Sequence, residues 1–432
     1  MESADQLPTS LPDALPVVGK DLPDGLGVVT PTWEPDVLPG FEQLTLPLEP
    51  DDEGEVFATL VRRARPEANN AMDAGGMDAG VDVLYVHGWT DYFHQVHVAD
   101  FFAKLGFTFY ALDLRKYGRS LRSWQTPGYI TSLKTYAADL KAALTAMGHG
   151  PDTPLPRKRS LVMMGHSTGG LIACLYAVGH PGVVDALILN SPWLEFQTGA
   201  IGRRALEGPV RAQARIAPTS GIINPDPGYY LRSVSAKYEG DWPLIEEWRP
   251  EDGWKPTAAW LNAIFRGQAR VAQGLDLKIP ILVLLSARST VPTRWKPELK
   301  SSDTVLVVSE VAQRAPTLGQ VVTTVRLEGA LHDVTLSAAP VRNIMWAEME
   351  RWINAYVPLP GSDGVVPLPL EPYAPPAPFD ADPEPDADQE QSADVATSLA
   401  ESLADQEHPN PHFWEAFGTL SRRFDPKKPW VR

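Results

Sequence analysis

The feature that most constrains the fold is a serine between two glycines, flanked by two apolar segments of different periodicity. Residues 160–164 are typical of a short buried strand, and residues 165–169 (Gly-His-Ser-Thr-Gly) are typical of a tight turn. After the turn, Leu171, Leu175 and Val178 recur at helical spacing. The stretch therefore predicts a buried strand, a sharp turn and a helix in direct succession.

Ser167 lies at the centre of this turn, in the Gly-x-Ser-x-Gly pattern of a nucleophilic serine. The small residues Gly165 and Gly169 allow strand and helix to approach closely, so the hydroxyl is expected above the sheet, near the positive end of the helix. The alternative is a serine that only caps the helix, since Ser is a favoured N-cap residue.

Predicted strands and helices alternate along most of the chain. This alternation predicts an α/β fold with a mostly parallel, doubly wound sheet, whose ligands bind at the carboxyl ends of the strands. The predicted strands cover residues 83–86, 107–112, 160–164, 186–190, 279–285 and 321–327, and predicted helices include 95–105, 133–147, 257–273, 304–314 and 341–356.

Three regions depart from this alternation. Residues 1–39 are rich in Pro, Asp and Gly and are expected to form a flexible arm, and the acidic, Pro-rich tail at 358–432 is expected to be largely disordered. The folded domain is expected at 40–357, opening with a hairpin of strands 41–49 and 55–63. Residues 193–256, rich in Trp and Tyr, interrupt the alternation and predict an inserted lid; the alternative is a subdomain without substrate contact.

Composition excludes several classes of protein. The formal net charge of −16 argues against a nucleic-acid-binding protein, and roughly nine of these charges lie after residue 360. The single cysteine, Cys174, allows no intrachain disulfide. The start of the chain lacks the pattern of a signal peptide, and no apolar stretch reaches the roughly 18 residues of a membrane span. We therefore expect a cytoplasmic setting, with at most transient contact with a membrane surface.

The base that activates Ser167 is expected to be His332. A serine hydroxyl needs a histidine to accept its proton, and His332 follows the last predicted strand, at the edge of the sheet that carries Ser167. The remaining histidines belong to turn motifs, precede the serine, lie about 20 Å away along the helix or fall in the tail: His87, His94, His97, His149, His166, His180, His408 and His412.

The carboxylate that orients this histidine is expected between the last two strands. Glu298, Asp303 and Glu310 are the candidates, and Asp303 is preferred because it comes directly before the helix predicted at 304–314. The alternative is that Asp303 is only the N-cap of that helix. Asp333 is too close in sequence to His332 to orient its ring and is interpreted as structural.

The oxyanion formed by attack on a carbonyl requires two hydrogen-bond donors, usually main-chain N–H groups. The N–H of Thr168, directly after the serine, is one candidate. The N–H of Trp89 is the other, because Gly88 allows a turn after the strand at 83–86.

Over residues 40–357 the ordered motifs resemble the α/β-hydrolase superfamily, and within it the serine aminopeptidase-like group that holds monoacylglycerol lipases and bacterial lysophospholipases. They are Val86-His-Gly-Trp89, Asp113-Leu-Arg-Lys-Tyr-Gly-Arg-Ser120, Gly165-His-Ser-Thr-Gly169 and Gly329-Ala-Leu-His-Asp333. The resemblance implies a Ser-Asp-His triad, a lid over an acyl pocket and hydrolysis without a metal or organic cofactor. Two segments depart from the family pattern: residues 286–290 lack the expected carboxylate, and His-Gly-Trp-Thr replaces His-Gly-x-Gly at 87–90.

These observations predict a serine hydrolase that cleaves a carboxylic ester of a lipid-like or apolar acyl substrate, of the lysophospholipid or monoacylglycerol kind. One alternative is an amidase or aminopeptidase, in which Glu246, Glu247 or Glu251 of the lid would bind a substrate amine. Another is a non-catalytic binding protein that uses the acidic tail to contact a protein partner of unknown identity.

Overall fold

The computed structural model of the chain describes residues 32–64, 78–150, 153, 159–197, 199–222, 228–291 and 293–357. The tail at 358–432 and residues 1–31 of the arm lie outside the described residues, so the structure does not test the expectations for them. Residues 32–39, expected to belong to the flexible arm, are part of the folded domain: Glu34–Pro35 pair with residues 42–43 as an edge strand, and Leu38 is buried.

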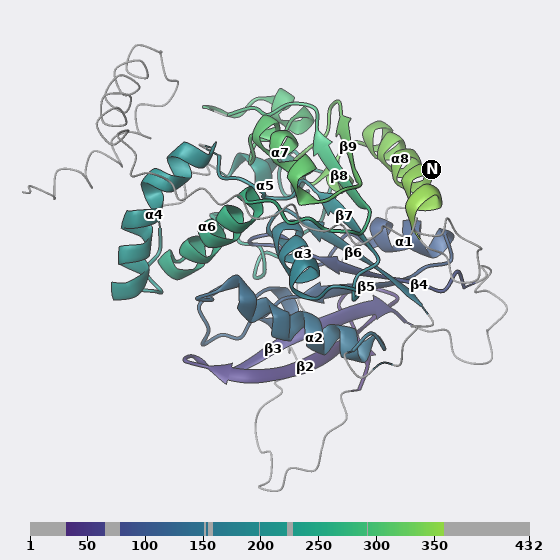
Figure 1. Cartoon of the computed structure of the whole chain (residues 1–432), viewed down its shortest axis with the longest axis horizontal. Helices are drawn as coiled ribbons and strands as arrows, with labels where there is room; N and C mark the ends of the chain where they lie inside the picture. Colours follow the sequence, from purple (N-terminus) through teal and green to yellow (C-terminus); the bar gives the residue numbers. More distant parts are fainter. Residues whose placement is uncertain are drawn as a thin grey trace, which may run out of the picture. The chain divides into compact units, whose positions relative to one another are not determined.

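A nine-stranded sheet forms the centre of the described domain, in the order β1-β2-β3-β5-β4-β6-β7-β8-β9 (Figure 1). The predicted opening hairpin is present as the antiparallel pair β2–β3, and the strands from β4 to β9 pair in parallel. The strands are β1 Glu34–Pro35, β2 Phe41–Asp51, β3 Gly54–Arg63, β4 Val81–Val86, β5 Thr108–Asp113, β6 Ser160–His166, β7 Ala186–Asn190, β8 Ile281–Ser286 and β9 Val322–Leu327.

Helices cover both faces of this sheet (Figure 1). One apolar core joins the sheet to α2, α3, α6 and α7, and a second joins its other face to α1 and α8. Neighbouring strand residues alternate between the cores: Met163 lies in the first and Met164 in the second, as the period of two in a strand requires. The helices are α1 Val96–Lys104, α2 Tyr136–Ala146, α3 Thr168–Gly179, α4 Gly199–Ile216, α5 Tyr229–Val234, α6 Ala258–Ala272, α7 Val308–Arg314 and α8 Ala339–Tyr356.

The register of the parallel strands gathers the predicted site at one edge of the sheet. Val86 at the end of β4 is aligned with Gly165 near the end of β6, and His166 is aligned with Asn190 at the end of β7. The residues that follow β4 and β6 therefore leave the sheet side by side. These are the turn that contains Trp89 and the turn that contains Ser167.

The residues predicted to form a lid leave the sheet after β7 and return at α6. They include α4, which lies beside α6 (Figure 1), and the short helix α5. Among the described residues, no helix is both long enough and apolar enough to cross a membrane.

One predicted helix begins later than its sequence pattern suggests. Residues 304–307 do not continue α7, which starts at Val308. The Asp303 carboxylate accepts hydrogen bonds from the N–H groups of Val305 and Leu306, at 2.8 and 2.7 Å. These bonds stabilise a turn in competition with the helix, as short Asp side chains commonly do.

Candidate active site

Ser167 occupies a strained turn between β6 and α3. Its backbone has φ 51° and ψ −114°, a conformation that non-glycine residues rarely adopt. Its N–H donates to the carbonyl of Asn190 at 3.0 Å, and its carbonyl accepts from the N–H of Trp193 at 3.0 Å. The side chain occupies the N-cap position of α3 but makes no capping hydrogen bond. Hydrogen bonds to neighbouring loops therefore stabilise the strained conformation of Ser167. Its hydroxyl does not cap the helix.

The glycines of the turn allow backbone segments to pass closer than any side chain would permit. A methyl group at Gly169 would lie 2.3 Å from the carbonyl oxygen of Val86 and 2.5 Å from that of His87. One at Gly165 would lie 2.5 Å from the carbonyl oxygen of Gly169. Strand β4, strand β6 and helix α3 are thus in direct backbone contact beneath the serine.

Replacing Gly169 by alanine is expected to lower the free energy of unfolding by about 3 kcal/mol or more, because the obstructing atoms belong to the backbone and cannot rotate away. The change in the midpoint of urea unfolding measures this effect. Gly179→Ala, at the end of the same helix, is the matched control. No atom lies within 4 Å of the added methyl group there, so we expect no loss of stability and a gain of up to about 1 kcal/mol. Equal effects of the two changes would contradict the role assigned to Gly169.

The turn after β4 places the predicted oxyanion donors next to Ser167. A methyl group at Gly88 would lie 3.1 Å from the Cβ atom of Ser167, so the turn passes directly beside the serine. Among the described residues, neither the N–H of Trp89 nor that of Thr168 donates to a protein acceptor. Both amides are therefore free to bind an incoming oxygen.

His87 fixes the shape of this turn. Its Nε2 atom accepts a hydrogen bond from the N–H of Leu114 at 3.0 Å, which leaves Nδ1 to donate to the carbonyl of Gly88 at 2.8 Å. Burial lowers the pKa of His87 and favours this neutral form. The ring thus holds the turn and is unavailable as a base.

His332 and Asp303, separated by 29 residues, meet at this edge of the sheet. The Nδ1 atom of His332 lies 2.9 Å from Oδ2 of Asp303, and both side chains are buried. The other carboxylate oxygen accepts the two N–H groups of the turn described above. Asp303 therefore orients the His332 ring and also stabilises its own loop, so the two interpretations of this residue are compatible.

Asp303 reaches His332 because the loop after β8 folds back on itself. Asp303 donates its N–H to the carbonyl of Arg288 at 3.0 Å, and its carbonyl accepts from Thr290 at 2.8 Å. A parallel bridge between Ser289 and Asp303 results, directly past the end of β8. The longer loop thus brings the Asp303 carboxylate back to the end of β8, beside residues 286–290, which carry no carboxylate.

Within the described part of the chain, Ser167 and His332 are not hydrogen-bonded to each other, and the residue next to the serine contacts the His332 ring. The ring of His332 lies 5.0 Å from that of His166, the residue before the serine, and packs edge-on against Tyr230 of α5 at 5.4 Å. Catalytic hydrogen bonds are commonly longer in a site without substrate and shorten on binding.

An aromatic wall surrounds Trp89, in the turn after β4. The ring of Trp89 packs at 4.0 Å from Trp260 of α6 and edge-on against Tyr117 at 5.8 Å. Trp193, whose N–H binds the carbonyl of Ser167, lies 6.0 Å from Trp260, and Trp254 of the lid lies 5.9 Å from Tyr117. This group, Trp89, Tyr117, Trp193, Trp254 and Trp260, is apolar and adjacent to the predicted oxyanion donors.

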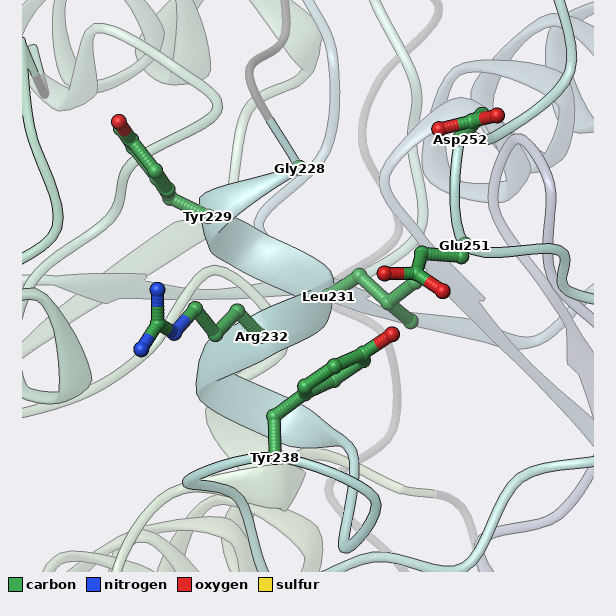
Figure 2. Close-up of a pocket in the computed structure, with 7 residues that line it drawn as sticks. All are labelled: Gly228, Tyr229, Leu231, Arg232, Tyr238, Glu251 and Asp252. Atoms are coloured by element: carbon green, nitrogen blue, oxygen red, sulfur yellow. The ribbon is translucent and has the colours of Figure 1, made fainter.

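A surface cavity of about 400 Å³ lies on another side of α5, away from His332. Figure 2 shows it lined by Tyr229, Arg232, Tyr238 and Glu251 together with their neighbours Gly228, Leu231 and Asp252. The next residue on the helix, Tyr230, is buried against His332. The cavity and the predicted catalytic residues therefore lie on different faces of this helix.

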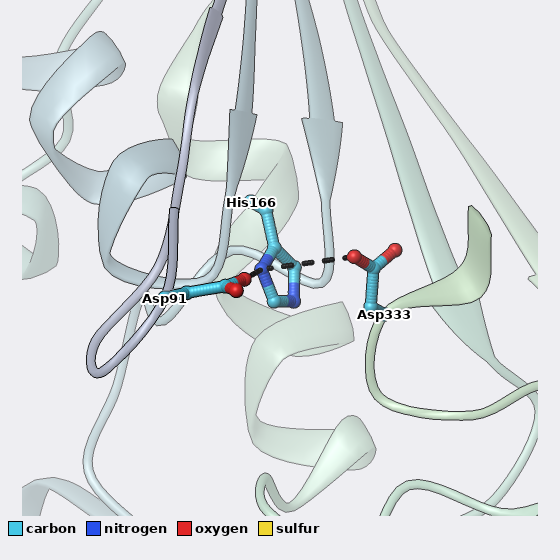
Figure 3. A group of neighbouring side chains, drawn as sticks. All are labelled: Asp91, His166 and Asp333. Carbon is cyan, nitrogen blue, oxygen red and sulfur yellow. Dashed lines mark ion pairs between the residues drawn. The ribbon is translucent and has the colours of Figure 1, made fainter. Parts of the chain in front are cut away.

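The sequence did not reveal a buried charged group beneath the serine. Asp91, His166 and Asp333 meet there: His166 is the last residue of β6, and the two carboxylates come from the loops after β4 and β9 (Figure 3). Arg249, within the segment predicted to form a lid, pairs with Asp91, with its Nη1 atom 3.0 Å from Oδ1. The only sequence signal was position: each of the three lies within two residues of Trp89, Ser167 or His332.

Comparison with known proteins identifies several similar chains. A monoacylglycerol lipase of Mycolicibacterium smegmatis is 27% identical over 205 residues, which are 47% of this chain and 68% of that protein. The AB hydrolase superfamily protein YisY of Bacillus subtilis is 33% identical over 115 residues, 26% of this chain and 38% of that protein. A soluble variant of the Saccharomyces cerevisiae monoglyceride lipase superposes with a TM-score of 0.48 at 15% identity, over 77% of this chain and 98% of that one.

The family model described as serine aminopeptidase, S33, matches residues 80–316, which is more than half of the chain. The match includes Trp89, Ser167 and Asp303 and ends before His332. Together with the parallel sheet and its covering helices, it confirms the predicted fold class and the resemblance drawn from the motifs. The chain belongs to the serine aminopeptidase S33 family of α/β-hydrolases.

Proposed function

We propose that this hydrolase cleaves carboxylic esters with an apolar acyl group through a covalent acyl-enzyme. Ser167 is the nucleophile, His332 is the general base and acid, and Asp303 orients the imidazole and stabilises its charged form. The N–H groups of Trp89 and Thr168 bind the oxyanion.

The reaction follows from these roles. His332 removes the proton of Ser167 as Oγ forms a bond to the carbonyl carbon, and the carbonyl electrons move onto the oxygen held by Trp89 and Thr168. The tetrahedral intermediate collapses, the bond to the alcohol breaks, and His332 donates its proton to the departing oxygen. A water then attacks the acyl-enzyme with His332 again as the base, which releases the acid and restores Ser167.

The observation that carries this proposal is the buried Asp303–His332 pair beside the strained turn of Ser167. Asp303 and His332 come from loops far apart in the sequence, and their contact is not needed to complete a helix or a strand. A serine, a histidine and a carboxylate in this arrangement are recognised by their geometry rather than by their position in the chain.

The aromatic wall supports an apolar acyl group. Its rings pack beside Trp89, whose N–H is the proposed oxyanion donor, so the proposed acyl-binding side of the site is bounded by Trp and Tyr side chains. The name of the Mycolicibacterium smegmatis relative, a monoacylglycerol lipase, points to the same class of substrate.

The lid also carries features suited to a lipid surface. Ile201 and Ile216 at the two ends of α4 are 74% and 86% exposed. Arg204, Arg211 and Arg215 are exposed on the same helix. Exposed apolar and basic side chains on one helix favour transient contact with a lipid surface, where a monoacylglycerol would be found.

A series of p-nitrophenyl esters of increasing acyl length tests this function. We expect kcat/KM to rise by about tenfold or more from the acetyl to a medium-chain ester, because each buried CH2 contributes about 0.8 kcal/mol. A fluorophosphonate should label the protein at Ser167. Failure of the wild type to react with the fluorophosphonate would contradict the serine mechanism, and equal rates for all acyl lengths would contradict the proposed preference for an apolar acyl group.

Two of the three carboxylates considered for the amidase alternative are already paired with a lysine. The carboxylates of Glu246 and Glu251 both pair with Lys237, at 3.1 and 3.5 Å, on the exposed surface of the lid. A substrate amine would have to displace this lysine from them. The tail on which the binding-protein alternative depends lies outside the described residues.

A further inference from the structure

The His166 ring lies between two buried carboxylates. Its Nδ1 atom is 3.6 Å from Oδ2 of Asp91 and 4.0 Å from Oδ2 of Asp333, as the dashed lines in Figure 3 show. Within the described residues, neither nitrogen of the ring makes a hydrogen bond, although both are buried. A proton on Nδ1 is therefore positioned to interact with both carboxylates and with no other partner.

Each member of this group lies within two residues of one of the proposed catalytic groups. Asp91 comes two residues after Trp89, His166 directly precedes Ser167, and Asp333 directly follows His332. Any force between these three side chains acts on the three loops that must be aligned for the reaction.

Asp333 is held rigidly by its other neighbours. Its Oδ1 atom accepts from Nδ2 of Asn190 and from Oγ1 of Thr335, both at 2.6 Å, and Oδ2 accepts from Nε2 of Gln95 at 3.2 Å. The Asn190 carbonyl in turn accepts the N–H of Ser167. The carboxylate is thus a fixed acceptor connected to the nucleophile turn on a second side.

Asp91 is connected to the lid. Residues 242–249, here called the lid arm, contact the core at the position of Asp91 and Tyr92. The guanidinium of Arg249 lies 3.0 Å from Asp91, and the N–H of Ile245 donates to the hydroxyl of Tyr92 at 2.8 Å. The ring of Trp248 also packs edge-on against Tyr92, with centroids 5.0 Å apart.

Arg249 supplies one positive charge beside the two carboxylates, and a protonated His166 supplies a second. Burial alone would lower the pKa of His166, but the carboxylates of Asp333 and Asp91 outweigh it and the pKa is raised. Burial likewise opposes ionisation of Asp91 and Asp333, yet Arg249 for the former and His166 for the latter keep both pKa values below their ordinary range. Arg249 and protonated His166 then neutralise the two carboxylates.

Other titratable groups border the same space. His94 Nε2 lies 3.6 Å from Oδ1 of Asp91, and the ring of His332 lies 5.0 Å from that of His166. The hydroxyls of Tyr85 and Tyr230 are buried, and burial raises the pKa of each well above neutrality. These phenols remain neutral at physiological pH, so the charge of the group depends on its histidines.

The same three side chains could each offer one atom to a metal ion, since those atoms lie within 4.8 Å of one another. Two features favour a proton instead. Ligands on zinc, with bonds of about 2.0–2.1 Å, lie about 3.3 Å apart, closer than the 3.6 and 4.0 Å separations here. Arg249 also already supplies a positive charge 3.0 Å from Asp91.

We propose that His166, protonated between Asp91 and Asp333, is a positioning residue that holds the Trp89 turn, the Ser167 turn and the His332 loop together, and that Arg249 couples this bridge to the lid. The inference rests on the proposed function, because its consequence is an effect on turnover. Loss of the proton leaves one uncompensated negative charge in the buried group and removes the attraction between the loops, so kcat falls at alkaline pH.

The test is the pH profile of kcat for hydrolysis of a p-nitrophenyl ester by the wild type and variants. The fall of kcat at high pH is called the alkaline limb of the profile. Arg249→Met removes a nearby positive charge, which raises the pKa of His166 and moves this limb to higher pH. Asp91→Asn removes a negative charge, so the limb moves to lower pH. His166→Gln removes the limb and lowers kcat by about 10- to 100-fold, as expected when reacting groups are misplaced. Arg249→Lys restores the position of the wild-type limb.

Controls separate positioning from general destabilisation. Arg232→Met removes another lid arginine, one that pairs with Glu239 on the surface, and should leave the profile unchanged. A variant that is only less stable loses activity without moving the limb. An NMR titration measures the pKa of the His166 ring without relying on turnover, with its signal identified by its absence in His166→Gln. This pKa should be higher in Arg249→Met and lower in Asp91→Asn than in the wild type.

The outcomes are distinguishable. If the wild type shows no Ser167-dependent turnover, the proposed function fails and the inference fails with it. If turnover depends on Ser167 but Arg249→Met and Asp91→Asn move the limb in the same direction or not at all, only the inference fails. Wild-type activity that is lost to a chelator and restored by Zn²⁺ or Ca²⁺ would overturn it in favour of a bound metal.

Discussion

Replacing Ser167 by alanine is expected to reduce kcat/KM for ester hydrolysis by at least about 10⁴-fold and to abolish labelling by a fluorophosphonate. The change removes the one atom proposed to bond to the substrate. Alanine keeps the Cβ atom at φ 51°, and the hydroxyl makes no capping bond to lose, so the stability of the fold should be nearly unchanged. Steady-state kinetics and mass spectrometry of the labelled protein measure the two effects.

Ser191→Ala provides a matched control for this change. Ser191 follows β7, is fully buried, has a positive φ of 44° and carries a hydroxyl without a hydrogen-bond partner among the described residues. It resembles Ser167 in strain and burial, but no chemical role is assigned to it, and we expect its loss to change turnover by less than about threefold. Turnover that persists in Ser167→Ala would exclude the proposed nucleophile.

Asp303→Asn is expected to lower kcat by about 10³- to 10⁴-fold with little effect on KM. The structure explains why an isosteric change should be so costly. The oxygen that faces Val305 and Leu306 accepts two N–H groups, so the amide oxygen of asparagine must occupy that place. The NH2 group then faces Nδ1 of His332, which makes Nδ1 an acceptor and places the ring proton on Nε2. A histidine protonated on Nε2 cannot take the proton of Ser167.

Glu310→Gln is the control for the carboxylate. Glu310 lies in α7 and was one of the two other acids considered between the last strands. It should retain turnover within about threefold of the wild type. If the effects were reversed, with Glu310→Gln inactive and Asp303→Asn active, the assignment of the acid would be wrong. If Asp303→Asn loses activity and its unfolding temperature also falls strongly, the main role of Asp303 is to stabilise the turn before α7.

The local elements of this fold were predictable because their signals are short in range. The hairpin, the parallel strands and the strand-turn-helix at Ser167 agree with the structure to within a few residues. The exception is α7, which starts at Val308 because Asp303 binds the backbone ahead of it. A side-chain hydrogen bond of this kind competes with the helix and has no periodic signal in the sequence.

The sequence by itself determined the strained serine turn, the alternation of strands and helices, and the place of His332 after the last strand, because glycine spacing and apolar periodicity act between near neighbours. Only the tertiary structure decided that Asp303 meets His332, since that contact requires the loop to return along residues 288–290. It alone brought Arg249 to Asp91, 158 residues away in the chain. Attraction between buried charges depends on distance in space, and no local pattern records which distant loops fold together.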